Sequence, residues 1–191
     1  MRTTIFYASK YGTTRLIAQE IGELLSTHDQ VTLLDVADCK QWPVTDDGFN
    51  KAERYVLGVP VYAGKPLRNM QRFCDRYASE LEKKPLFLFV CGMERLPEKQ
   101  QQEMEAAFPE NLRSVAHHVA FLGGALQWKK MNFVERLILA KITGKKGDQD
   151  LVSHRNIKKF AEVMVGAQPK SSVTPENSGT DESSGTPGTG S

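Results

Sequence analysis

The hydrophobic positions of this chain follow two alternating patterns. Short runs rich in β-branched and aromatic residues are separated by longer stretches in which apolar residues recur every three or four positions. The first pattern predicts strands and the second predicts amphipathic helices. The predicted strands are Thr3–Ala8, Gln30–Val36, Arg54–Tyr62, Pro85–Gly92 and His118–Leu126. The predicted helices run from just after Thr14 to Leu25, and over Asp46–Glu53, Leu67–Leu81, Glu98–Phe108 and Arg155–Val165.

Strands that alternate with helices of this length predict an α/β domain built on a doubly wound parallel sheet. Right-handed crossovers leave few topologies, and we expect five strands in the order 2-1-3-4-5. A ligand of such a sheet binds at the carboxyl ends of the strands, beside strands 1 and 3. Three loops should meet there, namely Ser9–Thr14, Tyr62–Pro66 and Cys91–Arg95.

The first of these loops has the chemistry of a phosphate site. It joins a strand to a helix, so backbone N–H groups and the positive end of the helix dipole point at one place. Ser9, Thr13 and Thr14 add hydroxyls, and Gly12 lets the backbone approach a ligand closely. The loop is neither a Walker A sequence nor Gly-x-Gly-x-x-Gly. An ordinary helix start capped by Ser or Thr is the alternative.

The pattern Ser-x-x-Gly-x-Thr-x-x-x-Ala, from Ser9 to Ala18, resembles the FMN phosphate loop of the flavodoxin family. The resemblance implies a flavodoxin-like fold, FMN as cofactor, and loops after the third and fourth strands that clasp the isoalloxazine ring. Tyr62 is then expected to stack on the ring, because its side chain offers a flat surface at little entropic cost. An aromatic residue that only covers the sheet edge is the alternative. The expected cofactor-binding residues are Ser9, Lys10, Tyr11, Gly12, Thr13, Thr14, Pro60, Val61, Tyr62, Ala63, Gly64, Cys91, Gly92 and Met93.

The two ring loops suggest finer roles. Gly64 is permissive enough for its peptide to turn when the flavin is reduced and to offer a carbonyl to the N5 hydrogen. The backbone N–H groups of Gly92 and Met93 would serve the pyrimidine edge of the ring. Cys91 is expected to be a small buried strand residue, since no resolving cysteine is near it in sequence.

Two other kinds of site are not expected. A phosphoryl-accepting receiver domain shares this sheet, but Tyr7-Ala8 and Pro60-Val61 stand where its acidic residues would be. No metal site is expected either, because the cysteines lack Cys-x-x-Cys spacing and the His117-His118 pair has no evident third ligand. We expect that histidine pair to mark the start of a strand.

The end of the chain differs in composition from the rest. From about Gln168 it is rich in Ser, Thr, Gly and Pro, so we expect residues 1–167 to form the domain and residues 168–191 a disordered tail. The 191-residue chain has a formal net charge of +2, and removing the acidic tail leaves the domain near +4. No apolar run approaches the about 18 residues of a membrane span, and a cytoplasmic location is expected.

The second half of the chain resembles a narrower group. Pro97-Glu98-Lys99, Gly123-Gly124-Ala125-Leu126 and the long segment before the last helix are similar to menaquinone-dependent protoporphyrinogen IX dehydrogenases, flavodoxin-fold enzymes of bacterial haem synthesis. This resemblance runs from about Thr3 to Val165. It implies an oxidoreductase that passes electrons from a reduced tetrapyrrole through FMN to a quinone. One departure is the acidic, Gln-rich stretch 100–105, where that family is expected to be more basic.

The segment Lys129–Lys146 predicts an extra helix between the fifth strand and the last helix. Apolar residues cover more than half of its circumference, and paired lysines flank it at both ends. Such a helix can lie on an anionic membrane surface, here the inner face of the cell membrane. It can equally pack on its own domain or in a dimer, and the sequence leaves these alternatives open.

Charge bears on the type of flavin chemistry. Lys10, Lys65 and Arg68 lie in or beside the expected flavin loops, where they favour an anionic reduced flavin and raise the two-electron potential. That favours substrate oxidation with transfer to a quinone, although no acid–base catalytic residue is evident. The alternative is a flavodoxin-like electron carrier whose basic face docks an acidic protein partner. A membrane-peripheral module without flavin is a third hypothesis, and nucleic acid is not an expected partner.

Overall fold

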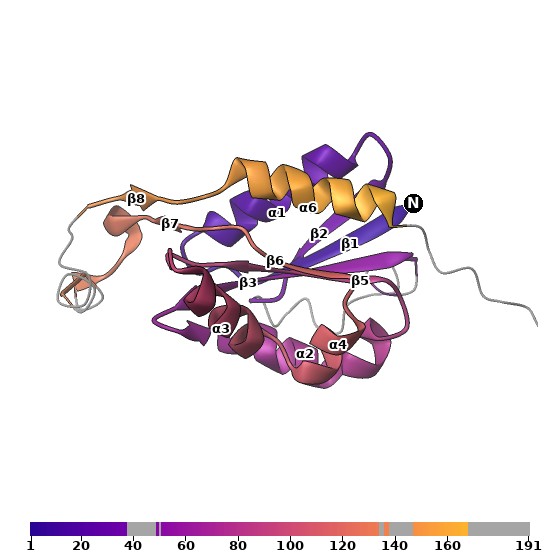
Figure 1. Ribbon diagram of the computed structural model, residues 1–191, viewed down its shortest axis with the longest axis horizontal. Coiled ribbons are helices and arrows are strands. Elements are labelled where there is room, and N and C mark those ends of the chain that lie inside the picture. The colour runs from indigo at the N-terminus through magenta and orange to yellow at the C-terminus, as the bar shows by residue number, and fades with distance from the viewer. Residues whose placement is uncertain (38–48, 50, 134–135, 138–146, 168–191) are drawn as a thin grey trace, which may run out of the picture.

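The computed structural model describes residues 1–37, 49, 51–133, 136–137 and 147–167 (Figure 1). Its strands are β1 Arg2–Tyr7, β2 Gln30–Asp35, β3 Arg54–Tyr62, β4 Lys65–Pro66, β5 Leu86–Cys91, β6 His118–Phe121, β7 Ala125–Leu126 and β8 Gln149–Asp150. Its helices are α1 Thr13–Leu25, α2 Arg68–Leu81, α3 Pro97–Ala107, α4 Glu110–Val115 and α6 His154–Gly166, with a 3₁₀ turn η2 at Trp128–Lys130. Within the described ranges no helix is both long enough and apolar enough to cross a membrane.

The central sheet confirms the predicted fold class and strand order. Its parallel strands follow the order β2-β1-β3-β5-β6, which is 2-1-3-4-5 for the predicted strands. Tyr7 at the end of β1 pairs with Asp35 of β2 on one side and with Gly58 of β3 on the other. The short strand β4 adds to the end of β3 in the antiparallel sense. Strand β1 is therefore the point from which the connections diverge to the two sides.

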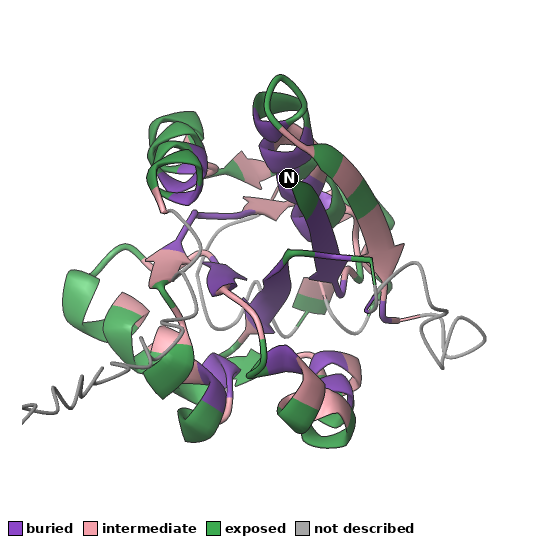
Figure 2. Cartoon of the chain, turned by 90° about the vertical axis from the view of Figure 1, so that its right-hand side faces the viewer, coloured by how far each residue is buried: buried purple, intermediate pink, exposed green. Residues whose placement is uncertain are grey.

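Helices cover both faces of this sheet. Helices α1 and α6 lie on one face, and α2, α3 and α4 lie on the other (Figure 1). Strand β3 is buried at every position except its last, and β5 is buried throughout; the burial colouring of Figure 2 places the buried segments at the centre of the molecule. Continuous apolar runs are what strands covered on both sides require. The loops lie at the carboxyl ends of the strands, where α1 begins at Thr13.

The predicted fifth strand is too long. Strand β6 ends at Phe121, and the chain turns at Gly123, which has a positive φ of 75°. A side chain at this position would lie 1.9 Å from the Leu151 carbonyl oxygen, because residues 151–152 cross the turn there. Ala125–Leu126 instead forms β7, which pairs with β8 in a separate two-stranded sheet. We call residues 125–133 and 147–150 the arm; it extends past the carboxyl ends of the main strands (Figure 1).

The long predicted helices are confirmed, with bounds shifted by one residue or so. The short helix α4 was not predicted, because its six residues carry too little periodic signal. The prediction of a helix over Asp46–Glu53 is wrong for residues 51–53, which are not helical, and for Phe49, which lies in a turn. The other residues of that range are outside the described residues. Of Lys129–Lys146, positions 133, 136 and 137 are helical and most of the remainder is outside the described residues, as is the tail 168–191.

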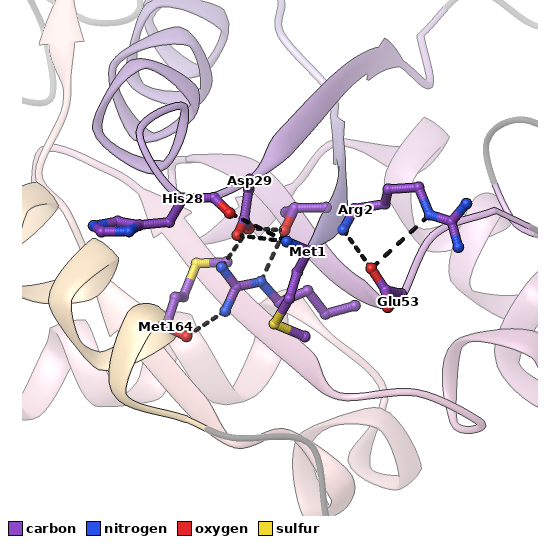
Figure 3. Close-up of polar contacts among 8 residues, drawn as sticks. Met1, Arg2, His28, Asp29, Glu53 and Met164 are labelled. Carbon is purple, nitrogen blue, oxygen red and sulfur yellow. Dashed lines mark hydrogen bonds and ion pairs between the residues drawn. The ribbon is translucent and has the colours of Figure 1, made fainter.

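A buried ion pair lies at the end of the sheet opposite to the loops. Arg54, only 2% exposed, places its Nη2 atom 2.5 Å from Asp29 Oδ2. Its Nε donates to Thr3 Oγ1 at 2.8 Å, and its Nη1 donates to the Met164 carbonyl. The N-terminal ammonium of Met1 lies 3.5 Å from the second Asp29 oxygen (Figure 3). One guanidinium thus connects β1, the chain before β2, β3 and α6.

The ion pair also determines the protonation of Asp29. Burial alone would raise the pKa of this carboxyl, but the hydrogen bonds from Thr3 and Arg54 outweigh it and hold the pKa below its ordinary value. The carboxylate therefore stays charged, and it depends on Arg54 for that charge to be tolerated in a buried site.

Replacing Arg54 with Leu should destabilise the protein strongly, because it leaves the Asp29 carboxylate buried without its partner. We expect a loss of about 3–5 kcal/mol in the free energy of unfolding, measured by urea denaturation at neutral pH. Arg2→Leu is the matched control, since the Arg2–Glu53 pair is 3.9 Å long with side chains 52% and 48% exposed. That change should cost less than about 1 kcal/mol. Equal losses in the two variants would contradict the assignment.

Candidate functional site

The three predicted loops meet at the carboxyl ends of β1, β3 and β5, where they enclose a cleft. The cleft contains about 360 Å³ of empty space, part of it open to solvent. Its lining residues are Tyr11, Thr13, Thr14, Pro60, Val61, Tyr62, Cys91, Gly92, Met93, Gly124, Ala125 and Leu126. The structure therefore brings most of the expected site residues together. The others, Ser9, Lys10, Gly12, Ala63 and Gly64, lie in the same loops but outside this lining.

The start of α1 is built by Gly12. This residue is the N-cap and adopts a left-handed conformation, with φ 101° and ψ −13°. Its N–H donates to Ser9 Oγ at 3.1 Å, so the serine shapes the loop. No side chain from the described part of the chain caps α1, and its first turn holds no acidic residue. The residue at the N-cap position is therefore a glycine and not a Ser or Thr, and the positive helix end faces the cleft.

Two threonines follow Gly12 and behave differently. The Thr13 hydroxyl donates to the Ala125 carbonyl at 3.0 Å, so it links the loop to the arm. Thr14, 1% exposed, has a buried hydroxyl oxygen with no hydrogen-bond partner among the described residues. A buried hydroxyl without a partner costs about 1–3 kcal/mol. Thr14 thus offers a buried donor at the helix start that could satisfy a ligand acceptor.

Cys91 lies under the cleft as a buried thiol. Burial raises its pKa to about 12, against a smaller lowering by the nearby Thr14 hydroxyl. Sulfur is a weak hydrogen-bond acceptor, so this contact does not replace a full partner for Thr14. The prediction that Cys91 is a buried strand residue fits its exposure of 2%. A thiol with so high a pKa is a poor nucleophile.

Aromatic side chains form one side of the cleft. The rings of Tyr11 and Tyr62 meet edge to face, with centroids 5.5 Å apart and planes at 81°. The Lys10 ammonium lies 5.0 Å from the centroid of the Tyr11 ring. Pro60 lies two residues beyond Gly58, the last β3 residue paired with β1, and is paired with Cys91 at the end of the β3–β5 ladder.

The loop after β3 is a tight hairpin. Tyr62 pairs with Lys65, and the two residues between them have positive φ values, 49° for Ala63 and 74° for Gly64. This is the geometry of a type I′ turn. Ala63 is the one non-glycine residue with positive φ in the described part of the chain, so the turn stores strain. No atom of the described residues lies within 4 Å of the position of a Cβ on Gly64, so the space there is open.

In the loop after β5, one of the two backbone N–H groups expected to contact the flavin ring already has a partner. The Gly92 N–H donates to the Gly123 carbonyl at 3.2 Å, so of the two expected ring donors only the Met93 N–H remains. A Cβ on Gly124 would lie 2.9 Å from the Gly92 carbonyl oxygen. The sequence analysis did not assign Gly124, Ala125 or Leu126 to the site. The paired glycines were the available signal, since glycine at a strand end often marks a close backbone approach.

A carboxyl group lies behind the same loop. Glu103 of α3 has one oxygen buried without a partner among the described residues, and a Cβ on Gly92 would lie 2.8 Å from it. Burial, and then the charge of Glu94, raise the pKa of Glu103. Glu94 itself accepts hydrogen bonds from the Leu96 and Arg95 N–H groups, and these lower its pKa. Glu103 thus protonates more readily than an exposed glutamate, which limits the negative charge behind the cleft.

The arm contributes one cation to the phosphate loop. Lys130 Nζ donates to the Tyr11 carbonyl at 3.2 Å and would lie 3.6 Å from a Cβ on Gly12. From the sequence this lysine was predicted only to flank the extra helix, because 119 residues separate it from Tyr11. No periodicity or motif signals a contact of that range.

The turn that carries Lys130 is held by several hydrogen bonds. The Trp128 N–H donates to Asp148 Oδ1 at 2.7 Å. Arg136 donates through Nε to the Trp128 carbonyl at 2.8 Å and through Nη2 to the Lys129 carbonyl at 2.9 Å. Beyond the turn, Phe133 is 80% exposed and Leu137 is 61% exposed.

Metal ligands do not gather in the described part of the chain, where no three His, Cys, Asp or Glu side chains could hold an ion. His118 opens β6, as the sequence predicted for the histidine pair. Burial lowers the pKa of His118, which favours the neutral form of a strand residue.

A family model for the flavodoxin domain matches residues 4–153 of this chain. Comparison with curated protein sequences finds no significant match. Three solved structures are similar in fold. The first is a short-chain flavodoxin associated with a bacterial microcompartment, with 19% identity, coverage of 87% of this chain and 97% of that chain, and a TM-score of 0.56. The second is oxidised flavodoxin 1 from Bacillus cereus, with 15% identity, coverage of 88% of this chain and 99% of that chain, and a TM-score of 0.52. The third is a WrbA-like flavodoxin from Agrobacterium tumefaciens, with 17% identity, coverage of 85% of this chain and 91% of that chain, and a TM-score of 0.51. With the family model spanning most of its length, the chain belongs to the flavodoxin domain family.

Proposed function

We propose that this chain binds FMN in the cleft at the carboxyl ends of β1, β3 and β5. The observation that carries the proposal is the Thr14 hydroxyl, buried and without a partner among the described residues, at the uncapped start of α1. An anion with several acceptor oxygens would satisfy this hydroxyl and the first N–H groups of the helix together. Membership of the flavodoxin domain family supports the same cofactor.

The residues present fit such a group. The loop from Ser9 to Thr14 would hold the phosphate, with Gly12 keeping the backbone open to it. Tyr62 and the Met93 N–H would position the ring, and the rim formed by Tyr11 and Tyr62 would limit the access of water. Bound FMN supplies reversible electron transfer, and the protein supplies its position and electrostatics.

Within that frame we propose an oxidoreductase similar to protoporphyrinogen dehydrogenase. The arm supports this choice, because Ala125 and Leu126 line the cleft and the exposed Phe133 lies further along the same segment. An apolar surface beside the cleft suits an apolar electron donor, such as a reduced tetrapyrrole, and a quinone acceptor. The residues of the cleft would supply binding and orientation, and no acid or base is proposed among them.

A flavodoxin-like electron carrier is the second candidate. Exposed cations come from the loops at the cleft and from the arm: Lys10, Lys65, Arg68 and Lys130. Such a face would attract an acidic redox partner and would make electron transfer depend on salt. The two candidates share the FMN site and differ in what approaches it.

The purified protein should take up FMN and show a flavin absorbance spectrum. The Thr14→Val variant should bind FMN about tenfold more weakly, since it removes a hydrogen bond to a charged group. Anaerobic addition of protoporphyrinogen should bleach the wild-type spectrum, and a menaquinone analogue should restore it. Electron transfer only to a protein acceptor, with steep salt dependence, would favour the carrier. A protein that takes up no FMN would contradict the proposed function.

The two-electron reduction potential of the bound FMN should lie above that of acidic flavodoxins. Lys10, Lys65 and Arg68 each favour negative charge on the ring, by on the order of 1 kcal/mol at solvent-screened distances. The potential can be measured by equilibration with reference dyes. The Lys65→Gln variant should lower it, while Lys158→Gln, an exposed change on α6, should leave it unaltered. A potential as low as that of acidic flavodoxins would remove the electrostatic argument.

We also propose that the segment Lys129–Lys146 contacts an anionic membrane surface, as its paired lysines and the exposed Phe133 and Leu137 allow. The double variant Phe133→Ser, Leu137→Ser should bind vesicles containing anionic lipid at least about tenfold more weakly than the wild type. The control is Val165→Ser, which changes an exposed apolar residue of α6. Co-sedimentation with vesicles measures the difference. Unchanged vesicle binding would contradict membrane contact, and a dimer lost in the double variant would indicate self-association instead.

A further inference from the structure

We infer that Lys130 of the arm binds the phosphate of the flavin cofactor and makes the site select FMN over riboflavin. The inference rests on the proposed FMN binding and goes beyond it, because it assigns a phosphate ligand outside the loop after β1. It also connects the arm, which lies beside the cleft, to the occupancy of the cofactor site.

The position of the ammonium group is the first step. Lys130 Nζ donates to the Tyr11 carbonyl at 3.2 Å and lies close to Gly12, the residue that begins α1. A lysine ammonium has three donors, so one bond to Tyr11 leaves two N–H groups for another acceptor. They lie at the same loop as the unsatisfied Thr14 hydroxyl. An anion at the helix start would therefore meet the hydroxyl, the first helical N–H groups and the ammonium.

The second step is that the lysine is held near the loop before any ligand arrives. The Thr13 hydroxyl donates to the Ala125 carbonyl, which fixes the beginning of the arm to the phosphate loop. The bonds from Trp128 to Asp148 and from Arg136 to the backbone of the turn fix the residues on either side of Lys130. A side chain carried by a prepared turn loses less conformational entropy on binding than one on a loose segment.

The third step is a comparison with the other lysine of the loop. Lys10 lies over the face of the Tyr11 ring, with its ammonium 5.0 Å from the ring centroid. Lys130 instead lies against the loop backbone. A phosphate monoester carries a charge of about −1.5 to −2 at neutral pH and three strong acceptor oxygens, and riboflavin has no such group. The ammonium of Lys130 thus discriminates between two flavins that share the same ring.

Selectivity between flavins tests the assignment. Flavin fluorescence quenching gives the Kd of FMN and of riboflavin for the wild type, Lys130→Met and Lys129→Met at low and high salt. Lys129 is the matched control, since it is an exposed lysine of the same turn. Lys130→Met should raise the Kd of FMN about tenfold and reduce its salt dependence, while the Kd of riboflavin stays within about twofold. Lys129→Met should change neither, and Lys130→Arg should recover most of the FMN affinity.

Each other outcome overturns the inference in a recognisable way. An unchanged Kd of FMN in Lys130→Met would show that the ammonium does not reach the phosphate. Equal weakening of FMN and riboflavin would show that Lys130 only supports the arm. A wild type that binds riboflavin and FMN equally well would remove the phosphate site while leaving a flavin site. A wild type that binds neither flavin would overturn the proposed function and this inference with it.

Discussion

The buried pair of Arg54 and Asp29 is the interaction on which the arrangement of the sheet depends. Parallel strands all begin at the same end of the sheet, so each connection must cross back to that end. The first residues of the strands are therefore neighbours in space although they are far apart in sequence. Arg54 does this with one side chain, because its donors reach Asp29, Thr3 and the Met164 carbonyl from β3. Removing one partner of a buried ion pair lowers the free energy of unfolding by more than the intact pair adds to it. The pair therefore disfavours other arrangements of these elements, in which one charge would be buried alone.

The two ends of the sheet are opposite in character. At the amino end, the polar groups around Arg54 are paired with one another. At the carboxyl end, Thr14 keeps a buried hydroxyl without a described partner and Ala63 keeps a left-handed backbone. Unsatisfied and strained groups persist only where the surrounding structure holds them, and they concentrate where a protein binds ligands. The contrast agrees with the proposal that the ligand binds at the carboxyl end of the sheet.

Sequence reasoning reached most of this architecture because its signals were local. The bounds of β3 follow from one uninterrupted apolar run, and the position of the loop Ser9–Thr14 at the cleft follows from residues that are neighbours in the chain. The missed features depend on distant segments. The end of β6 is set by Leu151 crossing Gly123, the Gly92 N–H is taken by Gly123, and Lys130 reaches a loop 119 residues earlier. A one-dimensional pattern contains no information on which backbone approaches which.

The cleft combines charges that act in the same direction. Lys10 and Lys130 add positive charge on the side of α1, and burial raises the pKa of Glu103 on the side of α3. Acidic side chains at those places would oppose negative charge in the cleft, whereas this arrangement tolerates it. A phosphate at one end and an electron-rich ring at the other would both gain from it. In the proposed complex the arm would have two effects, since it would add a cation beside the phosphate and an apolar wall beside the ring.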